Sequence, residues 1–114
     1  MIGRVQIGEH GVDMLATAST PYRLKQIFGI DYFQVVTAKK QPDATEMTDL
    51  YIKLGFVMAK QAEKADMNAV NEAAFFDWLD QFEPLEVALA VNDISNIYDS
   101  QAKSTAVPKN EAGE

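Results

Sequence analysis

The sequence predicts a mainly α fold of about five helices, preceded by an N-terminal β-hairpin, in one small domain. Three observations support this prediction. Apolar residues recur at spacings of three and four from residue 24 onward. Capping residues or proline precede the periodic segments. The chain has 114 residues, too few for two domains with separate cores. The helical domain is expected to cover residues 1–99.

The hairpin is predicted for residues 1–18. Alternating β-prone residues occur at 4–7 and 12–17, and Gly8-Glu9-His10-Gly11 between them suits a short loop. A lone hairpin is marginally stable in water, so we expect it to pack on the helices or pair with another chain.

Two short helices are expected next. Thr20 and Pro21 suit the N-cap and N1 positions of the first helix. Gly29 suits the left-handed residue that follows its last turn. The second helix is expected to start at Asp31 and to stop before Pro42.

The longest helix is predicted from Asp43 to about Ala65. Asp43 and Glu46 have the spacing of a capping box, and an apolar stripe of more than three turns follows them. Gly55 lies inside this helix, where Gly costs about 1 kcal/mol relative to Ala. We therefore expect another helix to cross closely at Gly55.

Two further helices are expected to start at Asn71, as N-cap, and at Pro84, as N1. The last helix is apolar over more than half of its circumference, which indicates central packing or a partner. Its main stripe consists of Val87, Val91, Ile94 and Tyr98. The apolar pattern then stops, so residues 100–114 are expected to form a flexible polar tail.

The charge of the chain is distributed unevenly. Ten basic and 17 acidic residues give a net charge of −7. Residues 65–102 contain eight acidic residues and no Lys or Arg, while the remainder sums to +1. This acidic block is a solvated face, a surface for a basic partner, or a surface that repels the domain from nucleic acid. Because nucleic-acid binding depends on clustered Lys and Arg, nucleic acid is not expected as a partner.

Little in the sequence indicates chemistry. The absence of Cys removes disulfides, Cys-based zinc sites and thiol catalysis. His10 is the only His, and Asp77 and Asp80 lack a second carboxylate–His helix. No segment approaches 18 uncharged apolar residues, so no membrane contact is expected. We predict no catalytic residues, no metal or cofactor, and no enzymatic activity.

The candidate binding residues lie in the last two helices. Phe75, Trp78 and Phe82 share one helical face and suit the core. Phe76 lies off that face, so it either packs on a different helix or is exposed for binding. We predict partner or self-association contacts for Phe76, Val87, Val91, Ile94 and Tyr98.

Three segments of the chain form an ordered set of motifs. Residues 20–29 read TPYRLKQIFG, residues 76–82 read FDWLDQF, and residues 103–109 read KSTAVPK. They resemble, in this order, the TPYRYKQxFG helix, the FxxWLDxF segment and the Thr/Ser-, Pro- and Lys-containing tail of one family. That family is the tail assembly chaperones of long-tailed phages and prophages of Gram-positive bacteria.

The resemblance implies a small, acidic, mainly helical protein that is not an enzyme. Such proteins bind the aggregation-prone tape measure protein and keep it soluble while major tail (tube) protein subunits polymerise around it. The resemblance also implies a location in the bacterial host cytoplasm and absence from the finished virion. Many members have a longer, frameshifted form. Many copies on one long client make self-association into an oligomer an expectation.

Two other functions remain as alternatives. A small acidic adaptor or regulatory protein, of the antitoxin or nucleic-acid mimic type, would use the carboxylates of residues 65–102. An enzyme would use Asp77 or Asp80 with His10, although no motif supports that combination.

Overall fold

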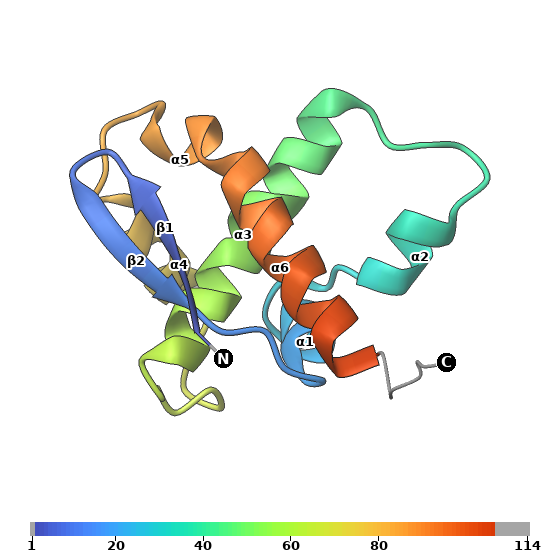
Figure 1. The fold of residues 1–114 in the computed structure, drawn as a ribbon, viewed down its shortest axis with the longest axis horizontal. Helices are drawn as coiled ribbons and strands as arrows, with labels where there is room; N and C mark the ends of the chain where they lie inside the picture. Colours follow the sequence, from blue (N-terminus) through green and yellow to red (C-terminus); the bar gives the residue numbers. More distant parts are fainter. Residues whose placement is uncertain (1, 107–114) are drawn as a thin grey trace.

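The fold is built around one long helix, α3, which the hairpin, α1 and α6 all contact (Figure 1). The computed structural model describes residues 2–106, with side chains up to residue 101. This confirms the predicted class, a mainly α domain with an N-terminal hairpin. The elements in order are β1 (Gly3–Ile7), β2 (His10–Met14), α1 (Thr20–Phe28), α2 (Tyr32–Thr37), α3 (Ala44–Ala62), α4 (Glu72–Leu79), α5 (Glu86–Leu89) and α6 (Val91–Ala106).

The hairpin packs one face on the helices. Strands β1 and β2 are antiparallel, and Val5, Ile7 and Met14 on their inner face are buried. The loop is shorter than the sequence predicts, because His10 already pairs with Ile7. Gly8 opens this two-residue turn with a φ of +60°, a conformation that glycine adopts without steric cost.

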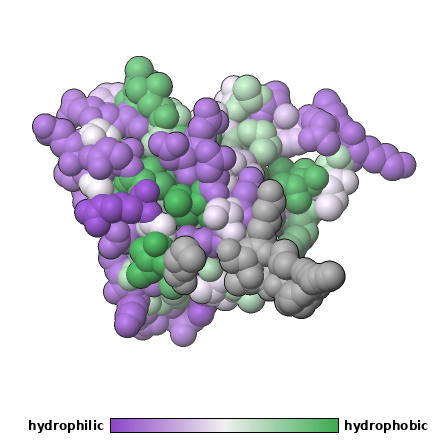
Figure 2. Space-filling view, viewed as in Figure 1, coloured by the Kyte–Doolittle hydropathy of each residue, from purple (hydrophilic) through white to green (hydrophobic). Residues whose placement is uncertain are grey.

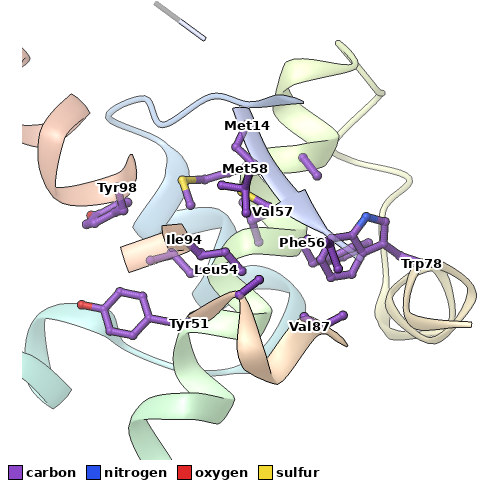
Figure 3. Close-up of a cluster of buried hydrophobic side chains, with 14 of the residues drawn as sticks. Met14, Tyr51, Leu54, Phe56, Val57, Met58, Trp78, Val87, Ile94 and Tyr98 are labelled. Atoms are coloured by element: carbon purple, nitrogen blue, oxygen red, sulfur yellow. The ribbon is translucent and has the colours of Figure 1, made fainter. Parts of the chain in front are cut away.

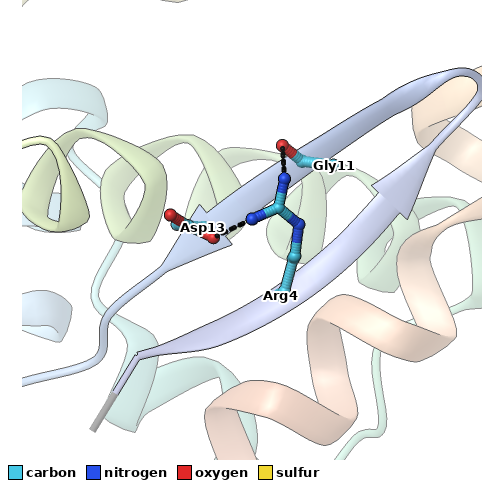
Figure 4. A network of polar contacts seen from close by, with 3 residues as sticks. All are labelled: Arg4, Gly11 and Asp13. Atoms are coloured by element: carbon cyan, nitrogen blue, oxygen red, sulfur yellow. Dashed lines mark hydrogen bonds and ion pairs between the residues drawn. The ribbon is translucent and has the colours of Figure 1, made fainter.

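The outer face of the hairpin carries a polar cross-strand pair (Figure 4). Arg4 stands opposite Asp13, and its Nη1 donates to Asp13 Oδ1 at 3.1 Å. The Nη2 of the same guanidinium donates to the backbone oxygen of Gly11 at 3.5 Å. The alternation of buried and polar residues therefore fixes which face of the hairpin meets the core.

Helix α1 starts one residue earlier than predicted. Ser19 is its N-cap, and Thr20 is the first helical residue and is fully buried. The Thr20 hydroxyl accepts from the N–H of Thr17 at 2.8 Å and donates to Oε1 of Gln61 in α3 at 2.6 Å. Thr20 therefore ties α1 to α3 and does not cap a helix. The helix ends as predicted at left-handed Gly29, which has a φ of +73°.

Helices α2 and α3 have the predicted caps. The Asp31 side chain accepts from the N–H of Gln34 at the start of α2. At the start of α3, Asp43 accepts from the N–H of Glu46 at 2.8 Å. Glu46 in turn accepts from the N–H of Asp43 at 3.1 Å, which completes the capping box.

The predicted close crossing at Gly55 is confirmed. Helix α6 crosses α3 there, and a Cβ on Gly55 would lie 3.0 Å from Cδ1 of Ile94. Only a residue without a side chain allows this approach without displacement of Ile94. The buried side chains around this crossing form a single cluster drawn from both strands and from α1, α3, α4, α5 and α6 (Figure 3).

Helix α4 has the predicted cap. Asn71 is its N-cap, and its side chain accepts from the N–H of Ala74 at 3.0 Å.

The last predicted helix is divided in two. Pro84, however, is not the first residue of a helix, because it lies in the turn before the one-turn helix α5. The chain bends at Ala90, which donates to the oxygen of Val87 at 3.0 Å, and α6 then begins.

The expected tail boundary at residue 100 is wrong. Helix α6 continues to Ala106, and Gln101 is buried. The N–H of Ala16 donates to Oε1 of Gln101 at 2.7 Å, and Nε2 of Gln101 donates to the oxygen of Met14 at 3.2 Å. These two bonds explain why a polar segment stays ordered here. Residues 107–114 of the expected tail lie outside the described part of the chain.

Candidate interaction surface

Several large apolar side chains remain uncovered by the fold. They occur on α1, α2 and α4, beside α5, at the end of α5 and at the start of the chain. Figure 2 shows hydrophobic residues, in green, gathered at separate places on a mostly hydrophilic face, among them the regions of α5 and α2. The set is Ile2, Tyr22, Phe33, Val36, Phe76, Leu85 and Leu89. Exposed apolar groups that lie close together mark sites of interaction.

Two of these side chains form an aromatic groove between α1, α2 and α6. The rings of Tyr22 and Phe33 lie 6.0 Å apart with an interplanar angle of 59°. They border a cavity of about 420 Å³. We call this cavity the aromatic groove, and its lining consists of Ala16, Thr17, Ala18, Pro21, Tyr22, Phe33, Tyr98 and Gln101.

Helical geometry explains why Tyr22 faces the solvent. Pro21 and Leu24 of α1 are buried, whereas Tyr22, between them, is 66% exposed. Phe33 is 50% exposed on α2, a helix in which no residue is fully buried. The two rings therefore contact each other at the surface and leave the groove open to a partner.

Three tyrosines, Tyr32, Tyr51 and Tyr98, pack the start of α2 against α3 and α6. The ring of Tyr32 lies 5.1 Å from that of Tyr98 in an edge-on arrangement, and Tyr32 also makes a side-chain hydrogen bond with Tyr51. Burial raises the pKa of Tyr32 well above its ordinary value, and the hydrogen bond with Tyr51 adds to the effect. Burial also raises the pKa of Tyr98, with smaller contributions from Tyr51 and Asp99.

The tyrosine contacts predict a loss of stability in alkali. Above about pH 10, tyrosines of the unfolded chain lose protons. Tyr32 and Tyr98 keep theirs in the folded state, so the unfolded state binds fewer protons and the free energy of unfolding falls as pH rises. Denaturant titrations from neutral pH upward measure the decline. The decline should be shallower in Tyr98→Phe, and an equal slope in this variant contradicts the assignment.

The predicted binding residues differ in how far the structure exposes them to solvent. Phe76 is 60% exposed, as a contact residue must be. Ile94 is completely buried under Gly55, so the prediction of a surface contact is wrong for it. Val87 and Tyr98 are also core residues, and each reaches only the wall of a groove. Val91 is half-buried against the core. The stripe faces inward because α6 crosses α3.

His10, the only His of the sequence, lies against an aromatic ring. His10 packs its ring edge-on against Phe82, with the ring centres 5.3 Å apart. Within the described residues no group of three or more His, Asp or Glu side chains could hold a metal ion. No helix in that part of the chain is both long and apolar enough to cross a membrane.

Sequence reasoning assigned no binding role to the most exposed apolar residues. Leu89 is 81% and Leu85 69% exposed, although both belong to the wide apolar face predicted for the last helix. Tyr22 carried no signal of its own because aromatic residues are common in helix cores. The adjacent aromatic residues Tyr32 and Phe33 offered a hint, because neighbouring side chains on a helix point in different directions.

No protein-family model, no curated protein and no solved structure matches this chain.

Proposed function

We propose that this chain is a phage tail assembly chaperone that binds and solubilises the tape measure protein while tail tube subunits assemble. The proposal rests on the three motif segments together with one structural observation. That observation is the uncovered aromatic groove beside Tyr22 and Phe33. A chaperone for an aggregation-prone chain needs apolar surface of this kind, because contact with it removes the apolar segments of the client from water.

The motif segments divide into residues that build the fold and residues that it leaves exposed. In residues 20–29, Phe28 packs against Phe56 and Phe75, with ring centres 6.1 and 5.0 Å away. Tyr22 of the same segment is exposed. In residues 76–82, Trp78 is buried and Phe76 is exposed. Each of these two segments thus offers one aromatic side chain to a partner, which supports a binding role.

The charge of the chain suits a temporary partner of a long client. The carboxylates of residues 65–102 give the complex surplus negative charge, which opposes aggregation and keeps it from nucleic acid. We further propose that the protein acts in the cytoplasm of the bacterial host, self-associates along the client, and leaves before the virion is complete.

A co-expression experiment tests the proposed function. We expect the chain to raise the soluble fraction of the tape measure protein encoded beside it several-fold. The double variant Tyr22→Ser, Phe33→Ser should lose most of this gain, because burial of apolar surface is worth about 25 cal/mol per Å². The control Ile2→Ser removes an exposed apolar side chain outside the groove and should retain the gain. No gain with the unaltered chain contradicts the function.

An acidic adaptor remains the second candidate because most carboxylates of the acidic block are exposed. No ion pair among the described residues involves any of its eight carboxylates. An adaptor of this type would bind a basic protein at low salt and release it at high salt, since screening weakens exposed charge pairs. Pull-down at two salt concentrations distinguishes it from the chaperone, whose apolar contact should persist.

A further inference from the structure

A second groove lies between α3, α4 and α5, and most of its lining belongs to the acidic block of residues 65–102. Its volume is about 430 Å³. Ile52 of α3, Leu79 of α4 and Val87 of α5 contribute apolar side chains to its walls. We call it the acidic-rimmed groove, and its full lining is Asp49, Ile52, Phe75, Leu79, Asp80, Phe82, Glu83, Pro84, Val87 and Ala88.

Two unpaired carboxylates set the charge at the edge of this groove. Asp49 is neutralised by Lys53, whose Nζ lies 2.9 Å from Asp49 Oδ2. Asp80 and Glu83 are exposed, and neither takes part in an ion pair among the described residues. Asp80 also lies at the C-terminal end of α4, where the helix dipole disfavours a negative charge. Asp80 therefore does not stabilise the fold through an ion pair or through the helix dipole.

The apolar surface continues beyond the groove. Phe76 precedes Asp80 by one turn of α4, so the two side chains lie on the same face of that helix. Phe76 is exposed, and its ring centre lies 5.7 Å from that of Phe75, which lines the groove. An occupant would thus meet apolar walls, an exposed aromatic ring and a negative rim.

The negative charge of Asp80 and Glu83 indicates which kind of partner fits the groove. A second copy that docked through the same surface would bring its own acidic block, which has no Lys or Arg over residues 65–102. Like charges at an interface oppose association. An amphipathic helix with an apolar face flanked by Lys or Arg matches both the walls and the rim. Such a segment fills the groove with one or two apolar side chains and neutralises Asp80 and Glu83.

We propose that the acidic-rimmed groove binds a basic amphipathic segment of the client protein. This inference rests on the proposed function for the identity of the client, and it adds the chemistry of the segment that is recognised. Binding combines apolar burial against Leu79 and Val87 with charge pairing at Asp80 and Glu83.

A labelled synthetic helix tests the proposal. The probe is a peptide of about five turns with Leu on one face and Lys on both flanks. Its fluorescence anisotropy should rise on titration with the full chain. The variant Asp80→Asn, Glu83→Gln should weaken binding about tenfold. The matched control Glu72→Gln, Asp77→Asn removes the same charge outside the groove, so its affinity should change less than threefold.

Each outcome of this test is decisive. Equal weakening by the two double variants, or equal binding of a peptide with Glu in place of Lys, overturns the proposal. So does a lack of binding by the unaltered chain. Loss of self-association in Ala88→Arg, but not in Leu89→Arg, would assign the groove to a second copy instead. If the chain binds the Lys peptide but leaves the tape measure protein insoluble, the groove proposal is supported and the proposed function is contradicted.

Discussion

Phe56→Ala lowers the free energy of unfolding by about 3–5 kcal/mol, the cost of a large cavity in a closed core. Phe56 lies on α3 and is fully buried. Its ring meets Phe28, Phe75 and Trp78 at centroid distances of 6.1, 5.3 and 5.7 Å. These aromatic contacts add to the loss of buried area. Domains of this kind have about 5–15 kcal/mol of stability, so the loss is a large fraction of the total.

Denaturant titration followed by circular dichroism measures this effect. The control is Phe76→Ala, which removes the same side chain from an exposed position on α4. Surface substitutions change stability by no more than about 0.5 kcal/mol. If both variants lose equal stability, then Phe56 is not the centre of the aromatic cluster.

Gln101→Leu lowers the free energy of unfolding by about 2–4 kcal/mol, because a buried carbonyl oxygen and a part-buried N–H of the backbone lose their partner. The Gln101 amide joins α6 to the chain at Met14 and Ala16, at 3.2 and 2.7 Å. Leucine has a similar volume but neither donor nor acceptor. The backbone N–H of Ala16 and the oxygen of Met14 are then left without this hydrogen bond.

Thermal and denaturant unfolding of Gln101→Leu provides the measurement. The control Gln34→Leu makes the same substitution at an exposed residue of α2, and its stability should be nearly unchanged. Hydrogen exchange of the Ala16 amide gives a second readout, since its protection should fall in Gln101→Leu. Unchanged protection would show that Gln101 does not hold the hairpin to α6.

The starts of α2, α3 and α4 were predictable, because their caps are local, whereas the predicted N-cap at Thr20 and N1 at Pro84 were not confirmed. The capping box at Asp43 and the side-chain caps at Asp31 and Asn71 involve groups within three residues of one another. Gly29 ends α1 for an equally local reason, its positive φ. Gly55 depends on a more distant contact. It was still predictable, because a glycine inside a long amphipathic helix costs stability that a close helix crossing can offset.

The role of the last apolar stripe was not predictable. A wide apolar face fits a core and a partner equally well, and the sequence contains nothing that separates the two. The crossing of α3 by α6 at Gly55 places Ile94 in the core. The same packing leaves Phe76 and Leu89 exposed. Whether an apolar residue is exposed therefore depends on how the helices pack against one another.

The sequence by itself determined the order of hairpin and helices, the caps at Asp31, Asp43 and Asn71 and the acidic block of residues 65–102, because each depends on composition or on neighbours along the chain. Only the tertiary structure decided which apolar residues remain for a partner and where the two grooves lie. It also decided the position of Gln101, whose polar side chain predicted an exposed tail. Its partners lie 85 and 87 residues away, so no local pattern could reveal that the amide is buried.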